Sequence, residues 1–335
     1  MPLIFASAQG SDSAALPTNC NAVLEQIAED SYMGNLRNDV HKNKIERRRS
    51  FSQNCRNTMK IVNGFDLMKY AGNHGYMLPA FNTTNMEMTY AIAKGLNMAG
   101  LPGYIQISSN NLRLSNPDVI ACLTSDALKN SDVPVGLHLD HGKSYEDVKA
   151  CVNAGFTSIM IDASHLPFEE NIKEVQRAVR YCHFYGIPVE AELGALRGKE
   201  EDIVNEADCK TDPDMVLDFV EQTGCDLLAV SVGNVHGLDI EPKVDLPLLK
   251  TISEISPVPL VMHGGSGIPF DVVKEARKYN LLKINYGSDL RKAFVSTFGK
   301  AYEANHNTAS VIELSMEAVE NVSKKAAELV TIINS

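Results

Sequence analysis

The chain has 335 residues, of which 44% are apolar and 22% charged, a balance typical of a globular protein. Its formal net charge of −11 argues against a nucleic-acid partner, because phosphate backbones are bound by basic surfaces. No apolar run approaches the roughly 18 residues that a membrane span needs, so no membrane partner is expected. The seven cysteines are scattered and form no Cys-x-x-Cys pair, which predicts reduced thiols and a cytoplasmic location.

Residues 1–58 differ from the rest of the chain. They lack sustained hydrophobic periodicity and end in a basic, Ser/Asn-rich stretch at residues 42–57. We predict a weakly ordered N-terminal extension here and one domain over residues 59–335. Acidic residues such as Asp12 and Glu25 argue against an organellar presequence, and a translation start at Met59 stays open as an alternative.

From Met59 onward, short β-rich runs alternate with helical patterns, which is typical of parallel βαβ units. Strands are expected at residues 76–81, 104–107, 133–139, 158–161, 188–193, 227–232, 259–262 and 282–284. Helices are expected between them, for example at residues 86–98, 145–153, 170–185, 213–222 and 272–278, and a last one at residues 311–333. Ser144 and Gly155 fit the two caps of one such helix. The pattern predicts an α/β fold, a TIM (β/α)8 barrel, whose active site lies at the C-terminal ends of the strands.

Three histidines stand just past apolar strands: His141, His236 and His263. A lone histidine at a strand end is more often a hydrogen-bonded structural residue. Three of them at different strand ends of one barrel favour a metal site instead. Neutral imidazoles from three directions leave an open coordination position, as catalytic zinc requires.

Acidic residues near the same strand ends have two expected uses. Asp162, Glu190 and Glu192 are placed to orient the ligand histidines. Asp140 is placed to transfer a proton to or from a substrate hydroxyl, with support of a ligand histidine as its alternative. His138 lies on the same side of its strand as Asp140, so alternation does not exclude it as a ligand.

Glycine-rich segments follow the seventh and eighth expected strands, at residues 264–267 and 285–288. Loops after these two strands commonly bind the phosphate group in a TIM barrel, through backbone N–H groups. Tight turns with no ligand are the alternative, but the position of both loops favours phosphate binding.

A polar, Gly-bearing segment at residues 194–204 follows the fifth strand. We expect a mobile loop that delivers Glu200 or Glu201 as a second acid or base over a closed site. A solvated surface loop is the alternative. A metal, a phosphate site and two carboxylates together indicate aldol chemistry on a phosphorylated ketose, although an isomerase would use similar parts.

Four motifs carry a resemblance to a known family: LHLDHG at residues 137–142, MIDASHLPFEENI at 160–172, VEAELG at 189–194 and VMHGGSG at 261–267. Together they resemble the class II, metal-dependent ketose-bisphosphate aldolases. The branch most similar to this chain holds tagatose-1,6-bisphosphate aldolases and some fructose-1,6-bisphosphate aldolases. The resemblance covers residues 59–335 and leaves residues 1–58 uncovered.

The resemblance implies a lyase that reversibly cleaves a tagatose or fructose 1,6-bisphosphate type of ketose to dihydroxyacetone phosphate and an aldehyde. It implies that His141, His236 and His263 bind one Zn²⁺ per subunit, with room for a monovalent cation, and that Asp140 is the proton donor. Asn285 would also steady the enediolate. Asp162 and Glu192 match acidic residues near an alternative metal position. The substrate-binding residues that it implies are Asn82, Ser108, Gly237, Gly264, Gly265, Ser266, Asn285, Tyr286, Gly287, Ser288 and Arg291.

The chain departs from the family at the aldehyde end. Fructose-type enzymes usually have Asp where this chain has Gly287, so the glycine favours tagatose-type selectivity. An Asp-Pro-Arg-Tyr-like segment before the last helix is missing, while Arg291 is retained at a position that reaches the distal phosphate in some members. These departures lead to the hypothesis that the aldehyde product is not glyceraldehyde 3-phosphate.

Three alternatives to this function stay open from the sequence. One is cleavage of a different ketose 1-phosphate, and another is a Schiff-base aldolase that uses Lys283. The third is a non-catalytic barrel that serves as a partner subunit. The family resemblance also implies a homodimer or homotetramer.

Overall fold

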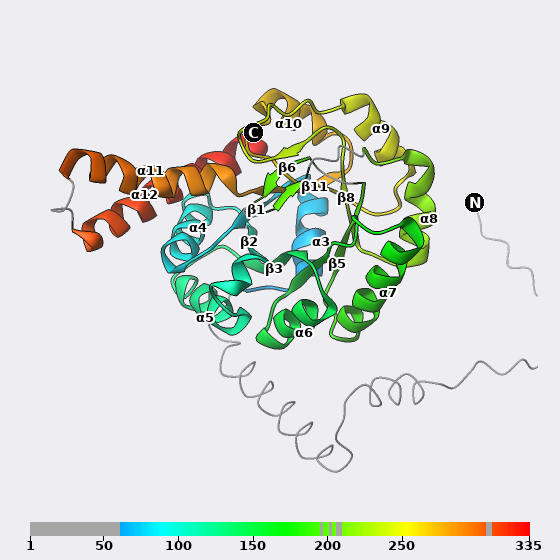
Figure 1. Ribbon diagram of the computed structural model, residues 1–335, viewed down its shortest axis with the longest axis horizontal. Helices are drawn as coiled ribbons and strands as arrows, with labels where there is room; N and C mark the ends of the chain where they lie inside the picture. Colours follow the sequence, from blue (N-terminus) through cyan, green and yellow to red (C-terminus); the bar gives the residue numbers. More distant parts are fainter. Residues whose placement is uncertain (1–60, 195–196, 201–202, 206–209, 306–309) are drawn as a thin grey trace, which may run out of the picture. The chain divides into compact units, whose positions relative to one another are not determined.

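The computed structural model describes residues 61–194, 197–200, 203–205, 210–305 and 310–335. The extension predicted at residues 1–58 lies outside them. Eight parallel strands form a closed barrel in the order β1-β11-β10-β8-β5-β4-β3-β2 (Figure 1). Their bounds are β1 Leu78–Asn82, β2 Gly103–Ser108, β3 Val135–Gly142, β4 Ser158–Ile161, β5 Val189–Leu193, β8 Leu227–Val230, β10 Leu260–Met262 and β11 Leu281–Tyr286. The predicted TIM barrel is confirmed.

Helices between consecutive barrel strands cover its outside (Figure 1). They are α4 Met86–Ala99, α5 Pro117–Ala127, α6 Tyr145–Ala154, α7 Phe168–Phe184, α8 Pro213–Thr223, α9 Leu246–Ile255 and α10 Phe270–Ala276, and a short 3₁₀ helix, η1 Asn111–Arg113, precedes α5. The predicted caps of α6 are confirmed: the Ser144 side chain accepts a hydrogen bond from the Asp147 N–H, and Gly155 has φ of 99°. Most buried apolar side chains lie between these helices and the sheet, in one continuous cluster.

A helix that the sequence analysis did not name, α3 (Gly64–His74), closes the N-terminal end of the barrel. The Gly64 N–H donates to the carbonyl of Thr157, which directly precedes β4. Leu67 and Ala71 of α3 pack with apolar residues from inside the barrel, including Leu78 and Tyr104. The barrel interior is therefore sealed from solvent at the end opposite to the predicted site.

Two further helices follow the last strand, α11 (Ser288–Asn305) and α12 (Val311–Ile333), and they lie side by side in Figure 1. α12 packs on α4, and the two helices approach closely at Gly95, where a Cβ atom would lie 2.6 Å from the Cβ of Ala326. In the described part of the chain, no helix combines the length and the apolar character that a membrane crossing requires.

Three short strands form a second sheet near the C-terminal ends of the barrel strands. β6 (Arg197–Glu200) and β7 (Ile203–Asn205) pair as an antiparallel hairpin, and β6 also pairs in parallel with β9 (Val235–His236). The segment predicted as a mobile loop, residues 194–204, therefore contains strand β6 and the start of β7, and its mobility stays a prediction. The β-branched pair Ile203 and Val204 favours an extended backbone, a signal that the polar neighbours masked.

Candidate metal centre and active site

A bulge at the end of β3 brings two consecutive side chains to the same site. Neighbouring residues of a regular strand point to opposite faces, so Asp140 and His141 could not normally both face the barrel interior. The register between β3 and β4 shifts between Leu139 and Gly142, and His141 has φ of 43°, which is rare outside glycine. β3 thus continues to Gly142, three residues beyond the predicted end, and it carries backbone strain at His141, a predicted functional residue.

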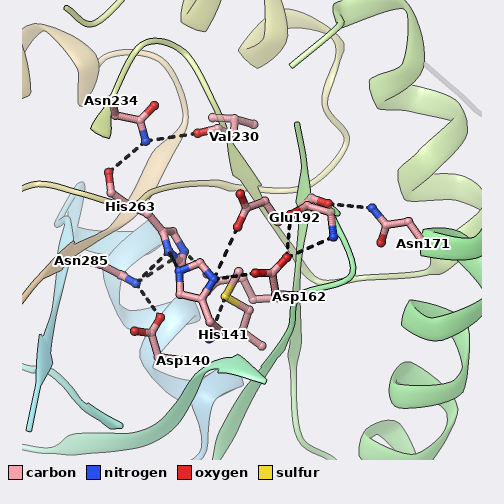
Figure 2. Close-up of polar contacts among 12 residues, drawn as sticks. Asp140, His141, Asp162, Asn171, Glu192, Val230, Asn234, His263 and Asn285 are labelled. Atoms are coloured by element: carbon pink, nitrogen blue, oxygen red, sulfur yellow. Dashed lines mark hydrogen bonds and ion pairs between the residues drawn. The ribbon is translucent and has the colours of Figure 1, made fainter. Parts of the chain in front are cut away.

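The three predicted ligand histidines converge, and one ring nitrogen of each lies within 4.8 Å of the others. Nδ1 of His263 is 2.8 Å from Nε2 of His141 (Figure 2). The ring of His236 lies 5.3 Å from the ring of His141, measured between centroids. His236 reaches this position from β9, where it pairs with Gly198 of the hairpin strand β6.

Two of the histidines, His141 and His263, each contact a carboxylate through one ring nitrogen. Nδ1 of His141 is 2.9 Å from Oδ2 of Asp162, and Nε2 of His263 is 2.8 Å from Oε1 of Glu190. We assign the N–H of each ring to the nitrogen that faces the carboxylate, since a carboxylate only accepts. The other ring nitrogens, Nε2 of His141 and Nδ1 of His263, then carry no proton and lie 2.8 Å apart. A metal ion bound by both nitrogens stabilises this arrangement. The donor set fits a divalent metal.

Both carboxylates are held in the charged form. Burial raises the pKa of Asp162, but the hydrogen bond from Nδ1 of His141, with the hydrogen bonds from Ser164, holds that pKa well below its usual range. Burial also raises the pKa of Glu190, and the Lys283 ammonium together with His263 more than reverses that effect. Asp162 and Glu190 therefore accept hydrogen bonds from the two histidines at neutral pH.

A second group that could hold a metal ion consists of His141, Asp162 and Glu192. Oε2 of Glu192 is 3.7 Å from Nδ1 of His141, on the same side of the ring as Asp162. The structure thus brings together the acidic residues predicted near an alternative metal position.

Asp140 is fully buried and accepts hydrogen bonds from two amide groups. Nδ2 of Asn82 donates to one carboxylate oxygen at 2.7 Å. Nδ2 of Asn285 donates to the other at 3.0 Å (Figure 2). Gln106, which the sequence analysis missed, donates from Nε2 to Oδ1 of Asn82 at 2.9 Å and so fixes the orientation of that amide. In the sequence, the only sign of this role is that Gln106 lies two residues before Ser108 and so faces the same side of β2. Asp140 thus projects from β3, next to His141, and its two amide partners come from β1 and β11.

The glycine loops line a pocket next to the histidines. Predicted residues in its wall are Asn82, His236, Gly237, Gly264, Ser266, Asn285, Gly287, Ser288 and Arg291. Thr84 and Met88 also line it and were not predicted. Gly264 has φ of 63°, and a Cβ atom there would lie 2.0 Å from the Val235 carbonyl oxygen, so no other residue fits this turn.

Three predicted substrate-binding residues do not line this pocket. Tyr286 has a buried side chain that packs in the outer apolar core, with its ring 6.1 Å from that of Phe81, so this side chain points away from the pocket. The alternation along β11 turns Tyr286 outward because Asn285 points inward. Gly265 packs on the backbone of Asn285, and buried Ser108 pairs with Asp140 in the β2–β3 register.

Glu200 lies in β6, but the structure does not describe its side chain, and Glu201 lies outside the described residues. His138 lies deeper in the barrel than His141, and its ring contacts Ser158 and Lys283. Lys283 is also buried and pairs with Glu190 at 2.8 Å. His138 belongs to no group with metal-ligand geometry among the described residues.

Comparisons with known proteins agree with this geometry. The profile of the family described as fructose-bisphosphate aldolase class-II matches residues 62–335. The fructose-bisphosphate aldolase of Geobacillus stearothermophilus is 38% identical over 242 residues, which cover 70% of this chain and 84% of that protein. That of Thermus caldophilus is 35% identical over 298 residues, or 80% of this chain and 97% of that protein.

Solved structures are similar as well. The YdjI aldolase from Escherichia coli K12 superposes with a TM-score of 0.70 at 32% identity and covers 80% of this chain and 95% of its own. A fructose-bisphosphate aldolase from Campylobacter jejuni, at 21% identity and a TM-score of 0.69, shares the fold. The chain belongs to the class II fructose-bisphosphate aldolase family. It is a carbon–carbon lyase that acts in carbohydrate metabolism on a phosphorylated ketose.

Proposed function

We propose that His141, His236 and His263 hold one Zn²⁺ ion in this aldolase and that Asp140 transfers the proton. The observation that carries the proposal is the convergence of the three imidazoles, two of them backed by carboxylates at 2.8 and 2.9 Å. When bound, the ion supplies Lewis-acid polarisation of the substrate carbonyl. A monovalent cation and the alternative position at Asp162 and Glu192 are secondary parts of the same proposal.

Residues of the chain itself transfer the proton and orient the group that carries it. In the cleavage direction, Asp140 accepts the proton of the substrate hydroxyl that becomes the aldehyde, and it returns the proton in the synthetic direction. Asn82 and Asn285 orient its carboxylate from both sides. Oδ1 of Asn285 has no hydrogen-bond partner among the described residues, so it is available to a substrate hydroxyl. Glu200 or Glu201 is proposed only as a second acid or base.

We propose that the loops around Gly237, Gly264 and Ser288 bind the phosphate of the dihydroxyacetone phosphate half. They line the pocket beside the metal site, and positive φ at Gly237 and Gly264 exposes backbone groups that side chains would cover. Ser266 adds a hydroxyl that also accepts the N–H of Asp289 at the start of α11. The residues left outside the pocket wall, Gly265 and Ser108, support the loops and the Asp140 strand.

For the substrate we propose a ketose 1,6-bisphosphate of the tagatose or fructose type. Gly287 favours the tagatose type, because the fructose-type enzymes that this chain resembles usually have Asp at this position. A Cβ atom there would lie 3.1 Å from Oδ1 of Asn82, the residue that orients Asp140. The relatives compared above are named for fructose bisphosphate. A ketose 1-phosphate with a different aldehyde half is the second candidate, favoured by the pocket lining, in which Arg291 is the only cation among the described residues.

Three further features stay part of the proposal. Residues 59–335 form the catalytic domain and residues 1–58 a separate extension. A cytoplasmic location is supported by the free thiols of Cys151, Cys182 and Cys225. Association into a homodimer or homotetramer is supported by exposed apolar side chains on α11 and α12, such as Val295 and Ile312.

A substrate panel tests the proposed function. Purified protein is assayed for cleavage of tagatose and fructose 1,6-bisphosphate and of the matching 1-phosphates, with and without a chelator. We expect cleavage of a bisphosphate, faster for tagatose than for fructose, and its loss with chelator. Faster cleavage of a 1-phosphate would favour the second candidate, and cleavage that survives complete metal removal would contradict the zinc proposal.

A further inference from the structure

A group of polar side chains lies inside the barrel, below the three histidines. Lys283 of β11, Glu190 of β5 and His138 of β3 are all at most 1% exposed. Apolar side chains adjoin them in the barrel interior, among them Leu78 and Val261, which pair in register with Lys283 on the two neighbouring strands. α3 seals the end of the barrel beneath them. The cluster is therefore shielded from bulk solvent, and its groups make their hydrogen bonds with one another.

Hydrogen bonds connect this cluster to the metal site through one residue. Nζ of Lys283 donates to Oε2 of Glu190 at 2.8 Å and approaches Nε2 of His138 at 3.4 Å. The other oxygen of Glu190, Oε1, accepts from Nε2 of His263 at 2.8 Å. Nδ1 of His263 then faces His141. Lys283 and the metal site thus hold opposite oxygens of a single carboxylate.

Fold stability does not account for an ion pair in this place. A buried ion pair contributes little net stability compared with well-packed apolar side chains, because both charges lose their hydration. A carboxylate left alone in this interior would be strongly unfavourable, so Glu190 requires the ammonium group of Lys283. Glu190 in turn is the group that orients His263. The ion pair of Lys283 and Glu190 therefore acts to orient His263.

We propose that Lys283 is a positioning residue for the metal centre. Its ammonium group holds Oε2 of Glu190, which turns Oε1 toward Nε2 of His263 and keeps Nδ1 of His263 directed at the metal. The proposal rests on the metal-binding role proposed for His263. It also gives Lys283 a role other than Schiff-base formation, because its amino group is fully enclosed between Glu190 and His138.

Zinc affinity tests this proposal without reference to turnover. Metal-free wild type, Lys283→Met and Lys283→Arg are titrated with zinc in competition with a coloured chelator of known affinity. We expect Lys283→Met to bind zinc about 10- to 100-fold more weakly, the usual effect of losing an outer partner of a ligand. Lys283→Arg retains the cation and should recover most of that loss.

Ser158→Ala is the matched control, because it removes the hydroxyl that contacts Nδ1 of His138 and leaves the contact between Lys283 and Glu190 in place. Its zinc affinity should equal that of wild type. A Lys283→Met protein with wild-type zinc affinity, or a Ser158→Ala protein that loses affinity as much as Lys283→Met, would overturn the proposal.

A double variant keeps the test usable if Lys283→Met does not fold. Lys283→Met combined with Glu190→Gln removes both charges, so the zinc-free protein should melt near the wild-type temperature. It should nevertheless bind zinc as weakly as Glu190→Gln alone, since both changes act through the same oxygen. Wild-type zinc affinity in the double variant would overturn the proposal. A wild-type protein that binds no zinc would instead overturn the metal site itself.

Discussion

The metal end and the aldehyde end of the pocket hold their side chains in different ways. At the metal end, Asp140, Glu190 and His263 are almost completely buried, and each is fixed by hydrogen bonds from more than one strand. At the proposed aldehyde end, Thr84 and Gly287 are half-buried and Arg291 is exposed, with one hydrogen bond to Oγ of Ser288. In the proposed function, the barrel therefore fixes the chemistry, while loops that can change without disturbing the barrel select the substrate.

The largest effect should come from the metal end. His236→Ala leaves two imidazoles, so we expect loss of bound zinc and a fall in turnover to the level of the metal-free protein. Metal content of the purified variant and its cleavage rate check this. His165→Ala, which removes an exposed histidine at the end of β4, is the control and should keep both. Retained zinc in His236→Ala would remove this residue from the ligand set.

The second-largest effect should come from Asp140, and it distinguishes loss of proton transfer from loss of the metal. Asp140→Ala should keep zinc and lower turnover by about 10²-fold or more, the usual scale of acid–base catalysis. Measurement of metal content together with the cleavage rate distinguishes this variant from His236→Ala. Near-normal turnover in Asp140→Ala would mean that another group moves the proton.

A smaller effect is expected at the aldehyde end. Arg291→Met should raise KM for a ketose bisphosphate by about tenfold and leave zinc binding unchanged, because one charge-assisted hydrogen bond is lost. Lys292→Met, a neighbouring exposed cation on α11, is the matched control with expected wild-type KM. An equal KM for Arg291→Met and wild type would place the distal phosphate elsewhere.

The smallest effect concerns selectivity. Gly287→Asp should shift the ratio of kcat/KM values a few-fold from tagatose toward fructose bisphosphate, on the scale of about 1 kcal/mol for one altered contact. Gly287→Ala separates the added carboxylate from the 3.1 Å approach of a Cβ atom to Asn82. The same ratio in all three proteins would show that Gly287 does not select the sugar.

Features that depend on strand periodicity were predictable from the sequence. The eight barrel strands were expected within a few residues of their bounds, and β4 (Ser158–Ile161) at its observed bounds. The polar residues that follow apolar strands identified His141, His236 and His263, because the fold itself brings those ends together. The amino-acid sequence alone therefore indicates where the site lies.

Features that depend on side-chain direction or tertiary packing were not predictable in this way. The bulge that turns both Asp140 and His141 inward leaves no periodic signal, and neither does the hydrogen bond from Gln106 to Asn82. Tyr286 was assigned to the phosphate site by its position in a glycine-rich segment, although β11 continues through it and turns it into the core. The closing role of α3 depends on contacts between residues far apart in the chain.

The central claim is that this barrel cleaves its substrate with a histidine-bound zinc ion. It is tested most directly by removing metal with a chelator, adding zinc back in measured amounts and following ketose-bisphosphate cleavage. We predict that activity disappears on chelation and returns fully at one zinc per chain, in wild type but not in His236→Ala. Full activity without metal, together with inactivation by borohydride in the presence of substrate, would contradict the account and point to a lysine Schiff base.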